Sequence, residues 1–88
     1  MIRFWFNFDF SNCNEEPPPG VRYGCGITAY SYEQAIFLLN EKVFRNQDIP
    51  NTFECIENVD ISTLDQGHVI PNMKAPIFFG IWFPIGYD

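Results

Sequence analysis

The first ten residues alternate strictly between large apolar and more polar side chains. The apolar set is Ile2, Phe4, Phe6, Phe8 and Phe10, and the opposite set is Arg3, Trp5, Asn7 and Asp9. A repeat of two with bulky β-forming residues is typical of a strand that buries one of its faces. The segment therefore predicts a strand that places a row of phenylalanines against a core, and its interrupted apolar run does not match a signal peptide.

Two glycines distinguish the second predicted strand, which covers Val21–Thr28. Gly24 and Gly26 fall on the same face of this strand and leave that face nearly bare, so a neighbouring group can approach it closely. The preceding segment, residues 11–20, predicts a surface loop, because it contains Pro17–Pro19 and proline lacks the N–H that a strand or helix uses. The sequence assigns no role to these three prolines.

One helix is expected after this strand. Ser31 and Gln34 fit a capping box, in which both side chains bond to exposed amides of the first helical turn. The helix should therefore run over residues 32–45, or one residue further. Apolar spacing over residues 52–59 and 77–83 then predicts a third and a fourth strand.

This order of elements predicts an α+β fold in which one main helix packs on a mostly antiparallel sheet of about four strands. With 88 residues, the chain is expected to form a single domain over residues 1–88. One helix covers only one face of a sheet, so we expect Trp5 and Trp82 on an uncovered face, where aromatic side chains concentrate binding energy. The alternative is that the two indole rings stack over Gly24 and Gly26 as structural cover.

Acidic residues outnumber basic ones by eleven to five, which gives the chain a formal net charge of −6. A negative surface repels a phosphate backbone, so we expect no nucleic acid as a partner. No basic residue occurs between Arg45 and Lys74. That stretch contains an acidic band formed by Asp48, Glu54, Glu57, Asp60 and Asp65. Such a band can steer a basic protein to the surface, and the alternative is a solvated acidic surface without a partner.

His68 is the only histidine, and Asp65 lies three residues before it. Together with Ser62 they would supply the nucleophile, orienting acid and base of a small hydrolase or transferase. No G-x-S-x-G turn accompanies them, however. The alternative is that Asp65 caps a turn and His68 bonds to a backbone carbonyl. The spacing of the potential ligands matches no zinc or calcium motif, so we expect no metal. We also expect no cofactor, and the missing turn argues against enzymatic activity.

The three cysteines, Cys13, Cys25 and Cys55, form no C-x-x-C pair and are expected to be reduced thiols of a cytoplasmic protein. Cys25 and Cys55 lie within predicted strands and should pack as small apolar side chains. No apolar run approaches the roughly 18 residues that are needed to cross a bilayer. We therefore expect no insertion into a membrane.

The C-terminal half of the chain resembles a group of small bacterial proteins. The resemblance runs from Asn58-Val59-Asp60-Ile61-Ser62-Thr63-Leu64-Asp65, through His68-Val69-Ile70-Pro71-Asn72-Met73, to Gly80-Ile81-Trp82-Phe83-Pro84, and includes Thr28-Ala29-Tyr30-Ser31. Some small acidic proteins of this kind act as immunity proteins, which protect a cell from a secreted toxin. The resemblance implies inhibition by binding and identifies no contact residue.

Together these observations favour a non-enzymatic immunity protein of the cytoplasm that occludes the active site of a bacterial toxin domain, expected to be a basic nuclease. Its acidic side chains would imitate the phosphates that the toxin holds. The expected contact residues are Glu54, Glu57, Asp60 and Asp65, with Trp5 and Trp82 as anchors. One alternative is a small hydrolase or transferase that uses His68 and Asp65. The other is a homodimer in which two aromatic faces cover each other.

Overall fold

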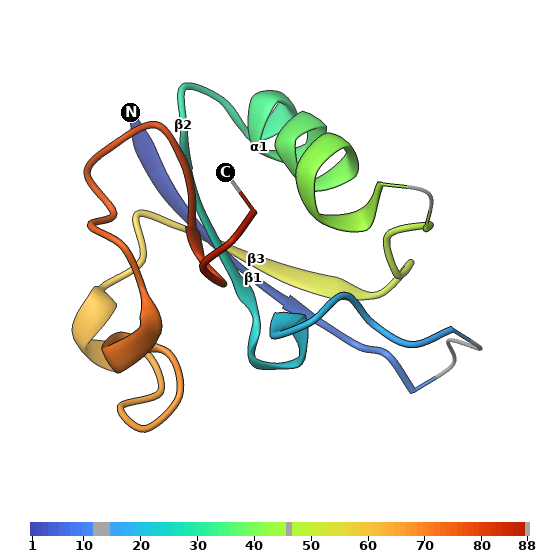
Figure 1. The fold of residues 1–88 in the computed structure, drawn as a ribbon. Helices are drawn as coiled ribbons and strands as arrows, with labels where there is room; N and C mark the ends of the chain where they lie inside the picture. The colour runs from blue at the N-terminus through green and yellow to red at the C-terminus, as the bar shows by residue number, and fades with distance from the viewer. Residues whose placement is uncertain (12–14, 46, 88) are drawn as a thin grey trace.

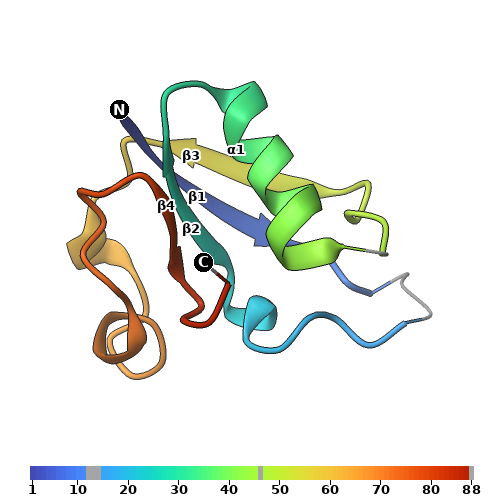
Figure 2. The ribbon, with the colours of Figure 1, turned by 45° about the horizontal axis from the view of Figure 1, so that its top comes forward.

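Four strands form one antiparallel sheet in the order β3-β1-β2-β4, and a helix lies against one of its faces (Figure 1 and Figure 2). The computed structural model describes residues 1–11, 15–45 and 47–87. The elements are β1 (Ile2–Phe8), β2 (Cys25–Ala29), α1 (Tyr32–Leu38), which continues as a π-helix over Leu39–Phe44, β3 (Phe53–Glu57) and β4 (Gly80–Phe83). The predicted α+β fold, with one main helix on an antiparallel sheet of four strands, is confirmed.

Helix α1 begins at the predicted capping residues. Ser31 Oγ accepts a hydrogen bond from the Gln34 amide at 3.1 Å, and Gln34 Oε1 accepts one from the Tyr30 amide at 2.8 Å. Two amides at the helix start are thereby satisfied. The π-helical continuation ends at Arg45, whose φ of 35° lies in the left-handed region. This agrees with the predicted end, and Asn46 lies outside the described residues.

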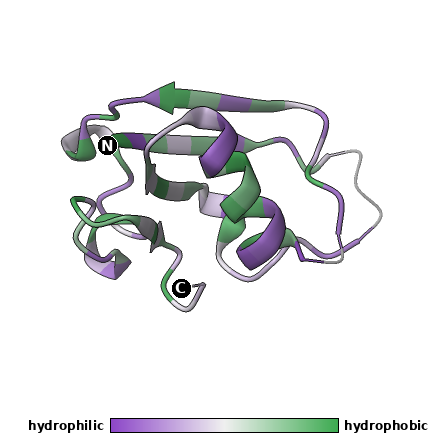
Figure 3. Cartoon of the chain, turned by 90° about the horizontal axis from the view of Figure 1, so that it is seen from above, coloured by the Kyte–Doolittle hydropathy of each residue, from purple (hydrophilic) through white to green (hydrophobic). Residues whose placement is uncertain are grey.

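The phenylalanine row of β1 faces the helix, as predicted. Phe4 and Phe6 are fully buried, and the Phe8 ring meets the Phe44 ring of the π-helix with centroids 5.2 Å apart. The rest of this first core is formed by Val21, Cys25, Ile27, Ala29, Ala35, Leu38, Leu39, Val43 and Ile81. Hydrophobic and hydrophilic residues alternate along the strands and around the helix (Figure 3). Burial of the apolar positions holds the helix on the sheet.

The predicted strands are shorter in the structure, and backbone angles explain three of the boundaries. Gly24 has a φ of 116°, and the residues before it, Val21–Tyr23, form a 3₁₀ turn instead of the start of β2. Asn58, with a φ of 53°, ends β3. Gly80, with a φ of 125°, begins β4, so residues 77–79 lie outside the sheet. A positive φ departs from regular strand geometry, so each of these residues marks the end of a strand.

The part of the second face that carries Trp5 and Trp82 is covered, so the expectation that both lie on an uncovered face is wrong. Residues 59–73, here called the 59–73 layer, cross this face and contain two 3₁₀ turns, Ile61–Thr63 and Ile70–Asn72. The apolar side chains of the layer are Val59, Ile61, Leu64, Val69, Ile70 and Met73. They form a second core with Phe83, Trp5 and Trp82, and the two tryptophans are only 3% and 1% exposed.

The described part of the proline-rich loop is fastened to two other segments. The Tyr87 hydroxyl donates a hydrogen bond to the Pro19 carbonyl at 2.8 Å, and the Gln47 side chain donates one to the Glu16 carbonyl at 3.1 Å. Pro18 between them is buried. These contacts connect the loop to the C-terminal segment and to the chain that follows the helix.

Candidate functional site

Trp5 and Trp82 pack over Gly24, which precedes β2, and over Gly26 within it. A Cβ atom added at Gly24 would overlap the Trp5 indole, and one added at Gly26 would overlap the Trp82 indole. The two indoles stack with centroids 5.8 Å apart, and Trp82 Nε1 donates to Thr28 Oγ1 at 3.1 Å. Stacking over the glycines is therefore confirmed. The prediction that these rings are exposed anchors for a partner is wrong, because the 59–73 layer buries both.

The buried Trp5 ring nevertheless orients an exposed carboxylate through Asn7. Trp5 Nε1 donates to Asn7 Oδ1 at 3.0 Å, and Asn7 Nδ2 donates to Glu54 Oε1 at 3.2 Å. Asn7 and Glu54 are direct partners in the β1–β3 pairing, so their side chains lie on the same face of the sheet. The Glu54 carboxylate is thus positioned by a chain of hydrogen bonds that begins in the second core.

Asp65 is a second acidic side chain whose orientation is fixed. Its Oδ1 accepts hydrogen bonds from the amides of Gly67 and His68 at 2.7 and 2.8 Å, and His68 Nδ1 lies 3.3 Å from the same oxygen. The amide hydrogen bonds from His68 and Gly67 hold the pKa of Asp65 below its ordinary value of 3.8. The His68 ring in turn stacks on the Tyr23 ring, with centroids 4.4 Å apart.

A groove of about 250 Å³ lies between the second face of the sheet and the 59–73 layer. We call it the Asp65 groove. It is lined by Trp5, Asn7, Tyr23, Ile56, Val59, Thr63, Leu64 and Asp65. Polar and apolar groups share the lining about equally. Asp65 is its charged residue, and Glu54 lies next to the groove, where it accepts a hydrogen bond from the lining residue Asn7. A carboxylate at the edge of such a groove can pair with a cationic side chain.

The other two predicted acidic contact residues lie elsewhere. Glu57 is on the face of β3 that turns toward the helix, opposite to Glu54. Asp60 caps a 3₁₀ turn, where its Oδ1 accepts hydrogen bonds from the Ser62 hydroxyl at 2.7 Å and the Ser62 amide at 3.0 Å. These bonds lower the pKa of Asp60. Of the four predicted acids, the structure therefore associates only Glu54 and Asp65 with the Asp65 groove.

The predicted Asp65–His68 pair forms, but Ser62 is not part of it, because its hydroxyl donates to Asp60. Asp65 caps a turn, as the structural alternative predicted, and His68 bonds to Asp65 instead of a carbonyl. No hydroxyl or thiol of the described residues is hydrogen-bonded to His68. Within the same residues, no three side chains that can ligate a metal lie together.

The two cysteines that the structure describes are free thiols. Burial raises the pKa of the Cys25 thiol, which is fully enclosed in the first core, and it also raises the pKa of the half-buried Cys55 thiol. Cys13 lies outside the described residues. Across residues 1–11, 15–45 and 47–87, no helix is long and apolar enough to cross a membrane.

Sequence reasoning missed an exposed apolar patch at one end of the sheet. It consists of Met1, Tyr30, Ile77, Phe78 and Phe79, which are 48–69% exposed, and we call it the 77–79 patch. The rings of Tyr30 and Phe79 lie with their centroids 5.9 Å apart. The apolar run over 77–83 indicated a buried strand, and Gly80 within that run was the only sign that its first residues leave the sheet.

Comparisons with protein-family models, with curated proteins and with solved structures found no match to this chain. Two surface features of the chain carry chemistry that can support a function. One is a groove with oriented carboxylates, and the other is an apolar patch of large side chains.

Proposed function

We propose that this chain is a non-enzymatic, cytoplasmic inhibitor of the immunity type, which binds a basic toxin domain and occludes its active site. The observation that carries the proposal is the pair of oriented carboxylates, Glu54 and Asp65, at the Asp65 groove. A nuclease holds phosphates with cationic side chains. Two carboxylates beside this groove can pair with the same cationic side chains.

The fixed orientation of both carboxylates supports this proposal. Glu54 is held through Asn7, and Asp65 is held by two backbone amides. Side chains that are ordered before binding lose less conformational entropy when a partner binds. The net charge of −6 further accelerates encounters with a basic protein, because opposite charges steer the approach.

The experiment is co-expression with the product of the neighbouring gene, followed by purification of the complex and measurement of its dissociation constant at several salt concentrations. We expect tight binding at low salt that weakens as salt screens the charges. The double variant Glu54→Gln, Asp65→Asn should bind about tenfold more weakly or worse. The double variant should inhibit the toxin less strongly, in proportion to its loss of affinity.

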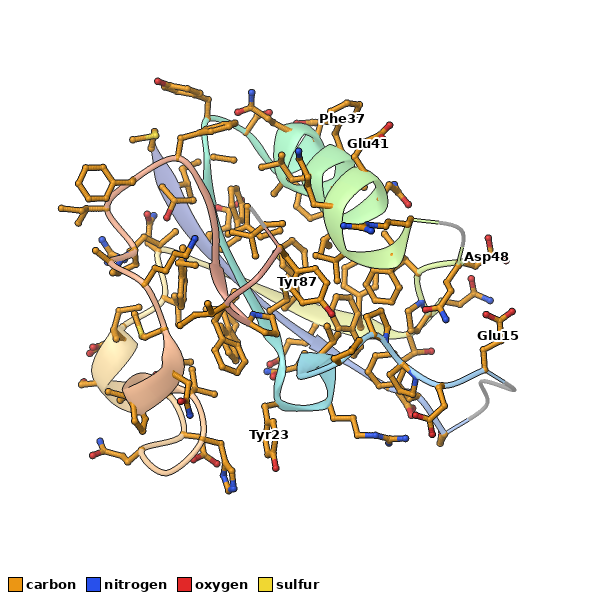
Figure 4. The ribbon with its side chains drawn as sticks, in the orientation of Figure 1. Glu15, Tyr23, Phe37, Glu41, Asp48 and Tyr87 are labelled. Carbon is orange, nitrogen blue, oxygen red and sulfur yellow. The ribbon has the colours of Figure 1, made fainter. Side chains whose placement is uncertain are left out.

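Glu41→Gln is the matched control, because Glu41 is an exposed carboxylate on the outer side of the helix (Figure 4). This variant changes the net charge by one unit without touching the Asp65 groove, so it should bind nearly as well as the unmodified chain. The proposal fails if no complex forms at low salt. It also fails if the double variant loses only twice the binding free energy that Glu41→Gln loses.

A further inference from the structure

We infer that the 77–79 patch is a self-association surface through which two copies of this chain form a weak dimer. The patch lies at the end of the sheet where β1 begins and β2 ends (Figure 1). Thr28 of β2 pairs with Gly80 of β4, so the preceding residues Ile77–Phe79 extend beyond this end. The inference concerns a surface that is separate from the Asp65 groove and does not depend on the proposed inhibition.

The backbone next to the patch is held in place by a buried residue. Thr28 is 2% exposed, and its hydroxyl donates a hydrogen bond to the Pro76 carbonyl and accepts one from Trp82 Nε1. Thr28 thus secures the residue that directly precedes the patch, while Tyr30 packs against Phe79 on the other side. A surface that is ordered in advance loses less conformational entropy on association.

The distribution of charge along the chain favours a second copy as the occupant. No Asp or Glu occurs between residues 66 and 87, so Ile77, Phe78 and Phe79 belong to a segment without carboxylates. Two chains that each carry a charge of −6 repel each other. Contact through a segment without carboxylates adds no like charge of its own at the interface. A basic partner finds no carboxylate to pair with in this segment, whereas a second acidic chain meets no like charge there.

The area of the patch suits a weak dimer. Three aromatic side chains of about 150–250 Å² each, roughly half to two-thirds exposed, and two aliphatic side chains offer roughly 500 Å² per copy. Two copies would therefore bury about 1,000 Å² in total, which is near the lower limit for a specific interface. Exposed apolar surface of this extent in one place commonly marks an interaction site.

A hollow next to the patch also favours a contact between two copies. A hollow of about 370 Å³ adjoins the patch. It is lined by Lys74, Ala75, Phe78, Phe79, Gly80, Ile81 and Trp82. In a two-fold dimer the same surface meets itself, so a protruding apolar side chain of each copy can enter the hollow of the other.

Sedimentation equilibrium over a series of concentrations, at low and at high salt, tests the inference. We expect a dimer whose association constant rises with salt, because salt screens the repulsion between two acidic chains. This dependence is opposite to the one expected for the toxin complex. Phe78→Glu should weaken the dimer by about tenfold or more, because it places a charge in the apolar contact.

Phe37→Glu is the control, because Phe37 is 59% exposed on the outer side of helix α1 and away from the patch (Figure 4). It should leave the dimer unchanged. A chain that stays monomeric at every concentration and salt overturns the inference, as does equal weakening by both variants. Flotation with phosphatidylcholine vesicles adds one more outcome: a monomer that binds these vesicles and loses binding with Phe78→Glu would assign the patch to lipid and overturn self-association.

Discussion

The Trp5 indole donates a hydrogen bond to the Asn7 side chain at 3.0 Å, and through this bond a ring in the second core orients the surface carboxylate of Glu54. The same ring closes over Gly24 and stacks on Trp82. Trp5 therefore supports the Asp65 groove as a buried residue and is not an exposed contact residue for a partner.

Asn7→Ala should destabilise the fold and release Glu54 from its fixed position. The nearly buried indole N–H of Trp5 loses its acceptor, which we expect to lower the free energy of unfolding by about 1–2 kcal/mol. Urea unfolding measures this difference. Asn40→Ala, at an exposed asparagine of the π-helix, is the control and should change the value by no more than about 0.5 kcal/mol. Similar losses in the two variants would mean that the Trp5–Asn7 bond adds nothing to stability.

Gly26→Ala should destabilise the fold by about 2–3 kcal/mol, as overpacking of a filled core does. The added methyl group would overlap the Trp82 indole, which the 59–73 layer holds against β2 from the other side. Gly67→Ala is the control, because its Cβ would meet only Asp65 Oδ1, at 3.4 Å. Thermal unfolding compares the two. An equally small shift in both melting temperatures would contradict close packing of Trp82 on Gly26.

Asp65 and Asp60 should make the stability of the fold depend on pH in acid. Hydrogen bonds hold both pKa values below the ordinary 3.8 in the folded chain. A carboxylate with a lowered folded pKa stabilises the fold above its unfolded pKa, and this contribution disappears as the pH falls through the folded pKa. We expect the free energy of unfolding to be level near neutrality and to decline below about pH 5. In urea unfolding measured as a function of pH, the free energy of unfolding of Asp65→Asn should fall less steeply in acid than that of the unmodified chain. An equal slope in the two proteins would argue against the role of the amide hydrogen bonds.

His68→Ala should leave both the fold and the binding of a toxin partner intact. The His68 ring lies outside both cores, so the substitution removes only the stack on Tyr23 and the contact with Asp65. We expect a loss of about 0.5 kcal/mol or slightly more in the free energy of unfolding. Assays with ester and phosphodiester substrates test the hydrolase alternative directly. Turnover that disappears in His68→Ala while folding persists would support catalysis and contradict a purely binding role.

Regular spacing explains which elements could be predicted from the sequence. The alternation around Phe4 and Phe6 and the capping pair Ser31 and Gln34 are local patterns, and both elements form where they were expected. The 59–73 layer has no such pattern. Val59, Leu64 and Val69 recur every five residues, which fits neither a strand nor a helix, so the cover over the second face could not be inferred from periodicity.

The candidate site also contains one contact that the sequence predicted and one that it did not. Asp65 and His68 are three residues apart, and their contact followed from sequence proximity. The bond between Asn7 and Glu54 joins residues 47 positions apart and depends on the pairing of β1 with β3, which the sequence did not specify. The expected exposure of the tryptophans was wrong because it assumed that only a helix could cover a sheet face.

Trp5 and Trp82 are the only tryptophans in the chain, and both are enclosed in the second core within contact of each other. Their fluorescence therefore originates from a single place, beneath the 59–73 layer. If that layer lifts while the sheet and helix persist, the emission should shift to longer wavelength before the far-ultraviolet circular dichroism changes. The unlabelled chain thus carries an intrinsic optical reporter that separates partial opening on one side from global unfolding.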